Sequence, residues 1–175
     1  LHQEGKGIYN AMNLGVTCSE TSSYVGILNS DDAYVSGSLR SVDKYIQEGY
    51  ELIHGICEII HENGDIEHHG LHHSLLPYKS IYHPTVFISK KTYNLNGAYD
   101  EKISLAADYD YFLRLYRNDV RMKYIPEVIS RFYTGGASYK KEYLGKWQYI
   151  NIRKRWGFIK LSEYIWEFIK IINKY

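Results

Sequence analysis

The sequence contains few cysteines and no long apolar run. Its 175 residues include two cysteines, Cys18 and Cys57, which are too few for a disulfide framework or a zinc knuckle, so we expect a reducing cytoplasm. No stretch approaches the about 20 apolar residues of a membrane-spanning helix. Residues 1–4 have neither the basic start nor the apolar run of a signal peptide. An initiator methionine is also absent, which predicts that the sequence begins within a longer protein.

Neither charge sign predominates, but tyrosine is abundant. Because 21 basic residues balance 20 acidic ones, we expect no overall electrostatic attraction to nucleic acid. With 45% hydrophobic residues and 19 tyrosines, the chain has enough apolar content for the core of one ordinary domain. A tyrosine suits a sugar ring as well as half-buried packing, and for any single tyrosine we favour packing.

Hydrophobic spacing predicts strands that alternate with helices, which indicates a layered α/β domain. Asn63-Gly64 is a strong hairpin signal after an expected strand, and the sequence from Lys140 onward is typical of a long helix. Expected helices cover residues 7–14, 39–46, 108–118 and a short stretch ending at Asn96-Gly97, and expected strands cover 24–28, 51–61, 86–88, 124–125 and 128–132.

Two pairs of aspartates are candidates for chemistry. Asp31 and Asp32 directly follow an expected strand, at the sheet edge where open α/β folds bind ligands, and their oxygens suit Mg²⁺ or Mn²⁺. A plain turn is the alternative. Asp108 and Asp110 stand at an expected helix start, where a carboxylate can act as a general base or can cap the helix and complement its dipole. On the local pattern alone, the turn and the cap are favoured.

Five segments, taken together and in sequence order, favour a functional site at these aspartates over a plain turn and a helix cap. Residues 4–13 (EGKGIYNAMN) closely resemble the DKGIYDAMNKG segment of family 2 glycosyltransferases, in the branch that builds bacterial surface polysaccharides. Residues 24–32 resemble that family's strand and metal motif, and 83–87 resemble the segment before its acceptor side. Residues 106–115 are similar to the EDYDLFLRL stretch that carries its base, and 132–138 to its late G-G-x-S loop.

The resemblance implies a nucleotide-diphospho-sugar transferase fold of the GT-A type, in which helices flank a central mixed sheet. Residues 1–138 would be the C-terminal part of the catalytic domain, and residues 139–175 a C-terminal helical extension. The family's N-terminal nucleotide-binding strands precede the segment that matches residues 4–13. The resemblance therefore implies that these strands are lacking here and that this stretch alone binds nucleotide poorly.

The resemblance also assigns roles to the residues of a site. Asp31 would bind a divalent metal, Mn²⁺ or Mg²⁺, on the donor diphosphate, with Asp32 as a further ligand or its neighbour. Asp108 would be the catalytic base of an inverting transfer from a nucleotide-diphosphate sugar to an acceptor hydroxyl. The remaining assignments are donor contacts at Lys6, Gly7, Asn13 and Asn29, and acceptor or pocket contacts at His83, Tyr109, Gly135 and Gly136.

Two positions depart from the family pattern. Asn29 stands where the D-x-D motif has its first aspartate, and a neutral amide oxygen is a weaker metal ligand than a carboxylate. Ala107 replaces a glutamate that many relatives have, which removes a second carboxylate but leaves the base.

Two other classes of function stay open. One is a catalytically inactive or sugar-binding remnant of such an enzyme, and the other is a zinc-binding domain, since neutral imidazoles are good zinc ligands. We favour a solvated hairpin and loop, because the histidine spacing lacks a regular helical pair with a nearby glutamate. The histidines concerned are His54, His61, His68, His69, His72 and His73.

The tail predicts an amphipathic helix. Leu161, Ile165 and Ile169 fall at helical spacing, and lysines and glutamates occupy much of the rest. Such a helix packs on the catalytic domain or lies in a membrane interface, and its mixed charges favour packing. The expected partners are a nucleotide-sugar donor and a saccharide or lipid-linked saccharide acceptor. The expected location is the cytoplasm, at the inner face of the plasma membrane if the helix contacts lipid.

Overall fold

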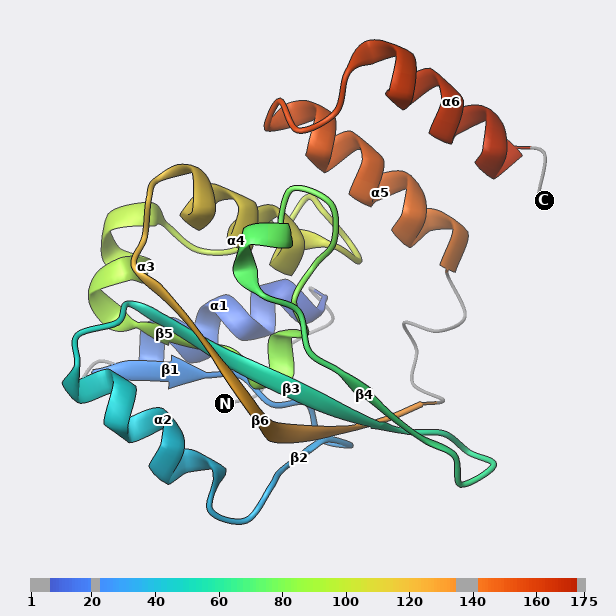
Figure 1. Cartoon of the computed structure of the whole chain (residues 1–175). Helices are drawn as coiled ribbons and strands as arrows, with labels where there is room; N and C mark the ends of the chain where they lie inside the picture. Colours follow the sequence, from blue (N-terminus) through green and yellow to red (C-terminus); the bar gives the residue numbers. More distant parts are fainter. Residues whose placement is uncertain (1–6, 20–22, 135–141, 173–175) are drawn as a thin grey trace.

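The computed structural model of the chain describes residues 7–19, 23–134 and 142–172. In these residues a mixed sheet of six strands lies between helices (Figure 1), which confirms the predicted α/β fold. The helices are α1 (Ile8–Cys18), α2 (Ser38–Gln47), α3 (Lys90–Asn96), α4 (Ala107–Arg117), α5 (Glu142–Arg155) and α6 (Leu161–Ile172). The strands are β1 (Tyr24–Gly26), β2 (Ala33–Tyr34), β3 (Leu52–Ile60), β4 (Ile66–His69), β5 (Phe87–Ser89) and β6 (Met122–Tyr133), and the short 3-10 turns are η1 (His73–Leu75) and η2 (His83–Thr85).

The strands β3 and β6 form the centre of the sheet. The strand order is β1-β5-β3-β6-β2, and β4 pairs with β3 beside this path. β3 runs parallel to β6, whereas β5 and β4 pair antiparallel with its other edge, β5 near its start and β4 near its end. The β3–β4 hairpin turns at Asn63-Gly64 as predicted, and Gly64 has the left-handed φ of 89° that favours glycine.

The pairing of β3 with β6 is interrupted near Gly55 and Pro126. The register shifts between His54 and Ile56. A proline has no N–H to donate to a strand ladder and is tolerated at such an irregularity. A Cβ atom at Gly55 would collide with the Ile129 side chain, so the close approach of the two strands requires glycine. The two short strands predicted around Pro126 are therefore one bent strand.

Alternate residues of the strands bury opposite faces of the sheet, as the pleat dictates. Leu52 of β3 and Ile88 of β5 belong to the core formed with α1, α3 and α4. Their chain neighbours Ile53 and Phe87 pack instead with Val42 of α2. One face is thus covered by α1, α3 and α4 and the other by α2, which brings α1 and α4 to the same side of the sheet (Figure 1).

The C-terminal part forms two helices, as expected for the helical extension, and the stretch typical of a long helix is divided between them. A turn at Gly157, with a left-handed φ of 74°, separates α5 from α6. α5 belongs to the main core, since Ile152 is 3% exposed. α6 packs on α5 through Tyr164, whose hydroxyl donates to the Asn151 side-chain oxygen at 3.0 Å. The helical segment expected at 139–175 therefore appears in its described residues, 142–172, as α5 and α6.

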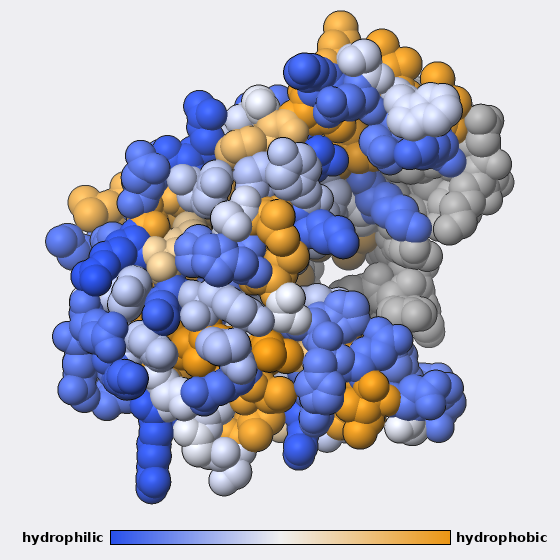
Figure 2. All heavy atoms as spheres, in the orientation of Figure 1, coloured by the Kyte–Doolittle hydropathy of each residue, from blue (hydrophilic) through white to orange (hydrophobic). Residues whose placement is uncertain are grey.

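The outer face of α6 leaves apolar side chains exposed. Leu161 is 65% exposed and Trp166 is 60% exposed, and Ile165 and Ile169 are exposed as well. Figure 2 shows hydrophobic residues gathered over this helix at the top of the molecule. Among the described helices, none is both long and apolar enough to cross a membrane.

A fully buried carboxylate, Asp110, joins α4 to α5. It accepts hydrogen bonds from Trp156 Nε1 at 2.9 Å and from the guanidinium groups of Arg114 and Arg155 at 3.3 Å each. Arg155 also pairs with Asp100 at 3.2 Å, closer to the surface. The packing of α5 on the main core thus depends on one buried charge.

Replacing Asp110 with asparagine should destabilise the protein. A neutral amide cannot balance two guanidinium groups, so we expect the free energy of unfolding in urea to fall by about 3 kcal/mol. Asp100→Asn is the matched control, because Asp100 pairs with the same Arg155 side chain nearer to solvent, and it should cost less than about 1 kcal/mol. Equal losses in the two variants would contradict a special role for Asp110.

Candidate active site

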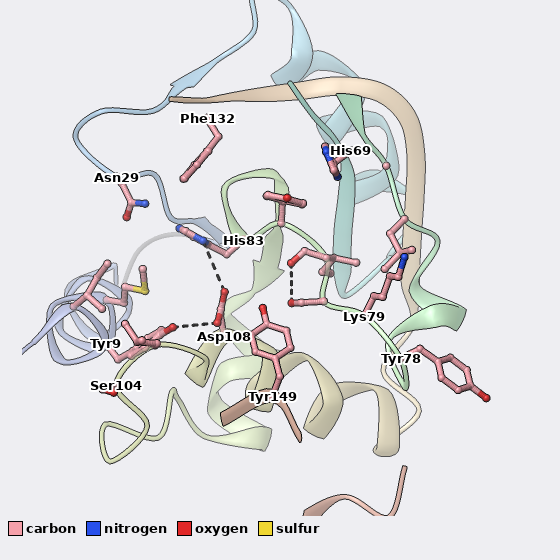
Figure 3. A pocket seen from close by; sticks show the side chains of 18 of the residues that line it. Tyr9, Asn29, His69, Tyr78, Lys79, His83, Ser104, Asp108, Phe132 and Tyr149 are labelled. Atoms are coloured by element: carbon pink, nitrogen blue, oxygen red, sulfur yellow. Dashed lines mark hydrogen bonds and ion pairs between the residues drawn. The ribbon is translucent and has the colours of Figure 1, made fainter. Parts of the chain in front are cut away.

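A cavity of about 640 Å³ opens where α1, β4, the η1–η2 segment and the start of α4 meet. Figure 3 shows its wall from close by. Distant parts of the chain contribute to this wall, since Tyr9 comes from α1 and Tyr149 from α5. Other polar or aromatic lining residues are Asn29, His68, His69, Tyr78, Lys79, Tyr82, His83, Ser104, Asp108 and Phe132.

Asp108, the predicted base, lies in this cavity as the second residue of α4. The Tyr9 hydroxyl donates to Asp108 Oδ1 at 3.1 Å, and His83 Nδ1 lies 3.9 Å from Asp108 Oδ2 (Figure 3). The Asp108 side chain is 16% exposed, so it is shielded from bulk water but reachable from the cavity. A carboxylate in this position can take a proton from a hydroxyl group bound in the cavity.

His83 lines the cavity, as predicted, and stands beside Asp108. Burial lowers the pKa of His83, and the negative charge of Asp108 opposes that shift. The imidazole is therefore neutral at neutral pH. Its Nε2 is buried and has no hydrogen-bond partner among the described residues. The Asp108 carboxylate thus faces an uncharged ring and is not neutralised by it.

Tyr109, predicted as a pocket residue, lies behind the cavity wall. It is fully buried, and its hydroxyl donates to the Leu76 carbonyl at 2.9 Å. Its ring stacks on that of Tyr149 with centroids 4.5 Å apart, and Tyr149 is the member of this pair that lines the cavity. Burial and then the Asp108 charge raise the pKa of Tyr149, which keeps its hydroxyl protonated.

The sequence did not single out Tyr9 or Tyr149. Both line the cavity, but each is one of 19 tyrosines, and local spacing does not separate a lining tyrosine from a packing one. The signal that would find them is long-range, because their positions depend on how α1 and α5 pack against α4.

Asn29, Asp31 and Asp32 form a turn after β1 at the edge of the cavity. The Asp32 N–H donates to the Asn29 carbonyl at 3.2 Å, and the Asn29 amide donates to Asp32 Oδ2 at 3.1 Å. Asp32 is 9% exposed, whereas Asp31 is exposed to solvent. Of these three residues, Asn29 lines the cavity. The turn expected as the alternative reading is therefore present, and it carries the predicted metal ligands.

The environment of Asp32 fits a cation. Its Oδ1 is buried with no hydrogen-bond partner among the described residues. Burial, and next the charge of Asp31, raise the pKa of the Asp32 carboxyl, so its ionised form is costly unless a positive charge comes close. In the described part of the chain, no three His, Cys, Asp or Glu side chains gather into a metal-binding group. A cation here would take its other ligands from a bound phosphate and from water, as Mg²⁺ usually does.

The predicted donor contacts near α1 have different surroundings. Asn13 is engaged structurally, because its amide donates to the Tyr99 carbonyl at 3.0 Å and its Oδ1 accepts from the Tyr99 N–H at 2.9 Å. Gly7 precedes α1 with a left-handed φ of 90°. The assignments that fall outside the described residues are Lys6, Gly135 and Gly136.

The histidines do not converge on one centre. His54 is fully buried on β3, with its Nε2 3.3 Å from His73 Nδ1. His68 and His69 lie instead on β4, where they pair with glutamates of the hairpin and line the cavity. Within residues 7–19, 23–134 and 142–172 they form no group of three metal ligands. His68, His69 and His72 are exposed on the hairpin and loop, which agrees with the solvated arrangement that the sequence favoured, whereas His54 is buried.

The fold of the chain is similar to that of solved structures. Three crystal structures of TarS from S. aureus are similar to the chain. The match to one structure covers 86% of this chain and 28% of the TarS chain, at 15% identity and a TM-score of 0.59. The match to TarS 1–349 in complex with UDP covers 99% of this chain and 53% of the TarS chain, at 14% identity and a TM-score of 0.61. The match to TarS 1–349 alone covers 93% of this chain and 58% of the TarS chain, at 16% identity and a TM-score of 0.59.

These likenesses show the fold alone, because the identities are low. The chain spans between 28% and 58% of the length of these solved chains. No protein-family profile matches the sequence, and no curated protein matches it significantly. The family 2 assignment therefore stays a prediction.

The adjacent histidines His54, which is buried, and His73, which is half-buried, should make stability depend on pH. Burial lowers the pKa of His54 to about 3 and that of His73 to about 4, from the ordinary value of 6.5. Below pH 6.5 the unfolded chain takes up protons that the folded chain does not bind. The contribution of these histidines to the free energy of unfolding should therefore be constant above that pH and fall as the pH drops towards 4.

Urea denaturation at a series of pH values measures this effect. His54 should contribute a slope of up to about 1.4 kcal/mol per pH unit. The slope should shrink in His54→Gln and persist in His68→Gln, which changes an exposed histidine of β4. An undiminished slope in His54→Gln would contradict the assignment.

Proposed function

We propose that the chain is the catalytic part of an inverting glycosyltransferase that moves a sugar from a nucleotide-diphosphate sugar to an acceptor hydroxyl, in the synthesis of a cell-surface polysaccharide. The observation that carries this proposal is the Asp108 carboxylate, which stands at the start of α4 in a cavity of about 640 Å³ with a hydrogen bond from Tyr9. The likeness to glycosyltransferase structures, one of them a complex with UDP, supports the same class of reaction.

In the proposed reaction Asp108 acts as the general base. Its Oδ2 takes the proton of the acceptor hydroxyl while the hydroxyl oxygen bonds to the anomeric carbon of the donor. The bond from that carbon to the diphosphate oxygen breaks, and its electron pair leaves with the nucleotide diphosphate. Attack on the face opposite the leaving group inverts the anomeric configuration. The bond from Tyr9 occupies Oδ1 and leaves Oδ2 for the proton.

The diphosphate of the donor would lie beside the Asn29–Asp32 turn. We expect Asp31 and Asp32 to hold Mn²⁺ or Mg²⁺ there, with Asn29 next to the donor. When bound, the cation would offset the charge of the leaving diphosphate. The unpartnered Oδ1 of Asp32 supports this placement.

The remaining family assignments concern binding. Lys6 and Gly7 would contact the donor, and Asn13 would act indirectly, since its bonds to Tyr99 fix α1. His83 and the Gly135-Gly136 loop would line the pocket on the acceptor side.

The acceptor would be a saccharide or a lipid-linked saccharide. A lipid-linked acceptor suits α6, whose exposed Leu161 and Trp166 side chains would enter a membrane interface. In that case the protein would work in the cytoplasm at the inner face of the plasma membrane.

Asp108→Asn should abolish sugar transfer. The full-length protein is incubated with a panel of nucleotide sugars and acceptors in Mn²⁺ or Mg²⁺, and release of the nucleotide diphosphate is measured. Loss of the base should lower kcat by at least about 100-fold. Asp43→Asn, which changes an exposed carboxylate on α2 at the other face of the sheet, should leave kcat unchanged.

Each other outcome has a clear reading. An active parent protein whose kcat is unchanged in Asp108→Asn would refute the assignment of the base. Binding of a nucleotide sugar by the parent protein without turnover of any donor would favour the inactive remnant.

Asp32→Asn should make the melting temperature of the protein insensitive to the divalent cation. The raised pKa of Asp32 means that its charge destabilises the folded state at neutral pH. Without metal, the variant should therefore unfold at a higher temperature than the parent protein. Added Mn²⁺ should raise the melting temperature of the parent protein and of Asp43→Asn but not that of Asp32→Asn. An equal response to Mn²⁺ in all three proteins would show that the cation binds elsewhere.

A further inference from the structure

Helix α4 begins without a side-chain cap of its own. Its N-cap position is Ala106, which is fully buried and whose side chain has no oxygen to accept a hydrogen bond. The first N–H groups of a helix have no partner within the helix, and a buried one needs a partner from elsewhere. The side chain that reaches this first turn from another element is Tyr9 of α1, whose hydroxyl bonds to Asp108.

The Tyr9 hydroxyl donates its proton to the Asp108 carboxylate. The distance from Tyr9 Oη to Asp108 Oδ1 is 3.1 Å. Burial and then the Asp108 charge raise the pKa of Tyr9, so the hydroxyl keeps its proton.

The position of Tyr9 is fixed by its surroundings. It is 7% exposed, and its ring packs against that of Tyr99 with centroids 5.8 Å apart. The bonds between Asn13 and the Tyr99 backbone hold α1 to the same segment. The hydroxyl is thus presented to Asp108 by a rigid helix.

Without the Tyr9 hydroxyl, the Asp108 carboxylate is free to form a different hydrogen bond. An aspartate in the first turn of a helix readily bonds to the free backbone N–H groups of that turn. Such a bond would draw the carboxylate onto its own helix and away from the cavity.

We propose that Tyr9 is a positioning residue for the catalytic base, because its hydroxyl bonds to Asp108 Oδ1 and so keeps the carboxylate directed into the cavity and away from the free N–H groups of α4. This inference rests on the proposed role of Asp108 in sugar transfer. Tyr9 acts on the reaction through Asp108 and does not itself accept the proton.

Tyr9→Phe tests this in the full-length protein. The variant keeps the ring and removes the hydrogen bond to Asp108, so kcat should fall by roughly 10- to 100-fold, as expected when a reacting group is misplaced. The KM values for donor and acceptor should change less than about twofold, because binding contacts are kept. Tyr99→Phe is the matched control, since it packs on Tyr9 and bonds to Tyr93 at 3.1 Å, and its kcat should be unchanged.

The double variant separates positioning from a structural effect. In the Asp108→Asn background, Tyr9→Phe should cause no further loss of kcat if Tyr9 acts through Asp108. Losses that multiply in the double variant would overturn the proposal, as would an unchanged kcat in Tyr9→Phe alone.

NMR of the two tyrosine variants tests the contact without any turnover. Tyr9→Phe should shift the backbone amide and side-chain carboxyl signals of Asp108, and Tyr99→Phe should leave them in place. If the parent protein transfers no sugar, the proposed function fails. These signals still decide whether Tyr9 fixes the position of the Asp108 carboxylate. Asp108 signals that do not move in Tyr9→Phe would overturn the positioning role.

Discussion

The pairing of β3 with β6 is the interaction on which the rest of the structure depends. One edge of β3 carries β6 along its length, so the other edge is free to pair with β5 near its start and with β4 near its end. The irregularity at Gly55 and Pro126 bends β6 without breaking the pairing. Because β5 and β4 share this edge, the segment between them is held over one face of the sheet. That segment supplies much of the cavity wall, including Lys79 and His83.

Helix α4 links the sheet to the candidate active site. Its first turn carries Asp108 and Asp110, which are two residues apart and therefore about 200° apart around the helix. Asp110 consequently faces the core, where it binds Arg114, Arg155 and Trp156, while Asp108 faces the cavity. Two aspartates with the same local sequence context thus have opposite roles. Asp110 fixes the helix against α5, and the fixed helix holds Asp108 at the cavity.

Much of the fold, but less of the site, was accessible from the sequence. Apolar spacing predicted the layered α/β fold, Asn63-Gly64 predicted the hairpin, and Asp108 was expected at a helix start. The sequence pattern did not locate the break at Gly157, because apolar residues continue at helical spacing on both sides of it. Tyr109 was expected in the pocket but packs behind it, and Tyr9 was not expected there at all. Both depend on contacts over long sequence distances, since Tyr9 reaches Asp108 across 99 positions.

The charges around the cavity join the two parts of the proposed mechanism. Asp108 and the buried Asp32 are both acidic, and the His83 ring is neutral because burial lowers its pKa. A nucleotide diphosphate would add further negative charge, so its binding beside Asp32 requires a cation to offset both. The base has the opposite requirement, because a full positive charge next to Asp108 would weaken it as a proton acceptor. A neutral hydroxyl from Tyr9 meets this requirement, since it orients the carboxylate through a hydrogen bond and leaves its charge in place.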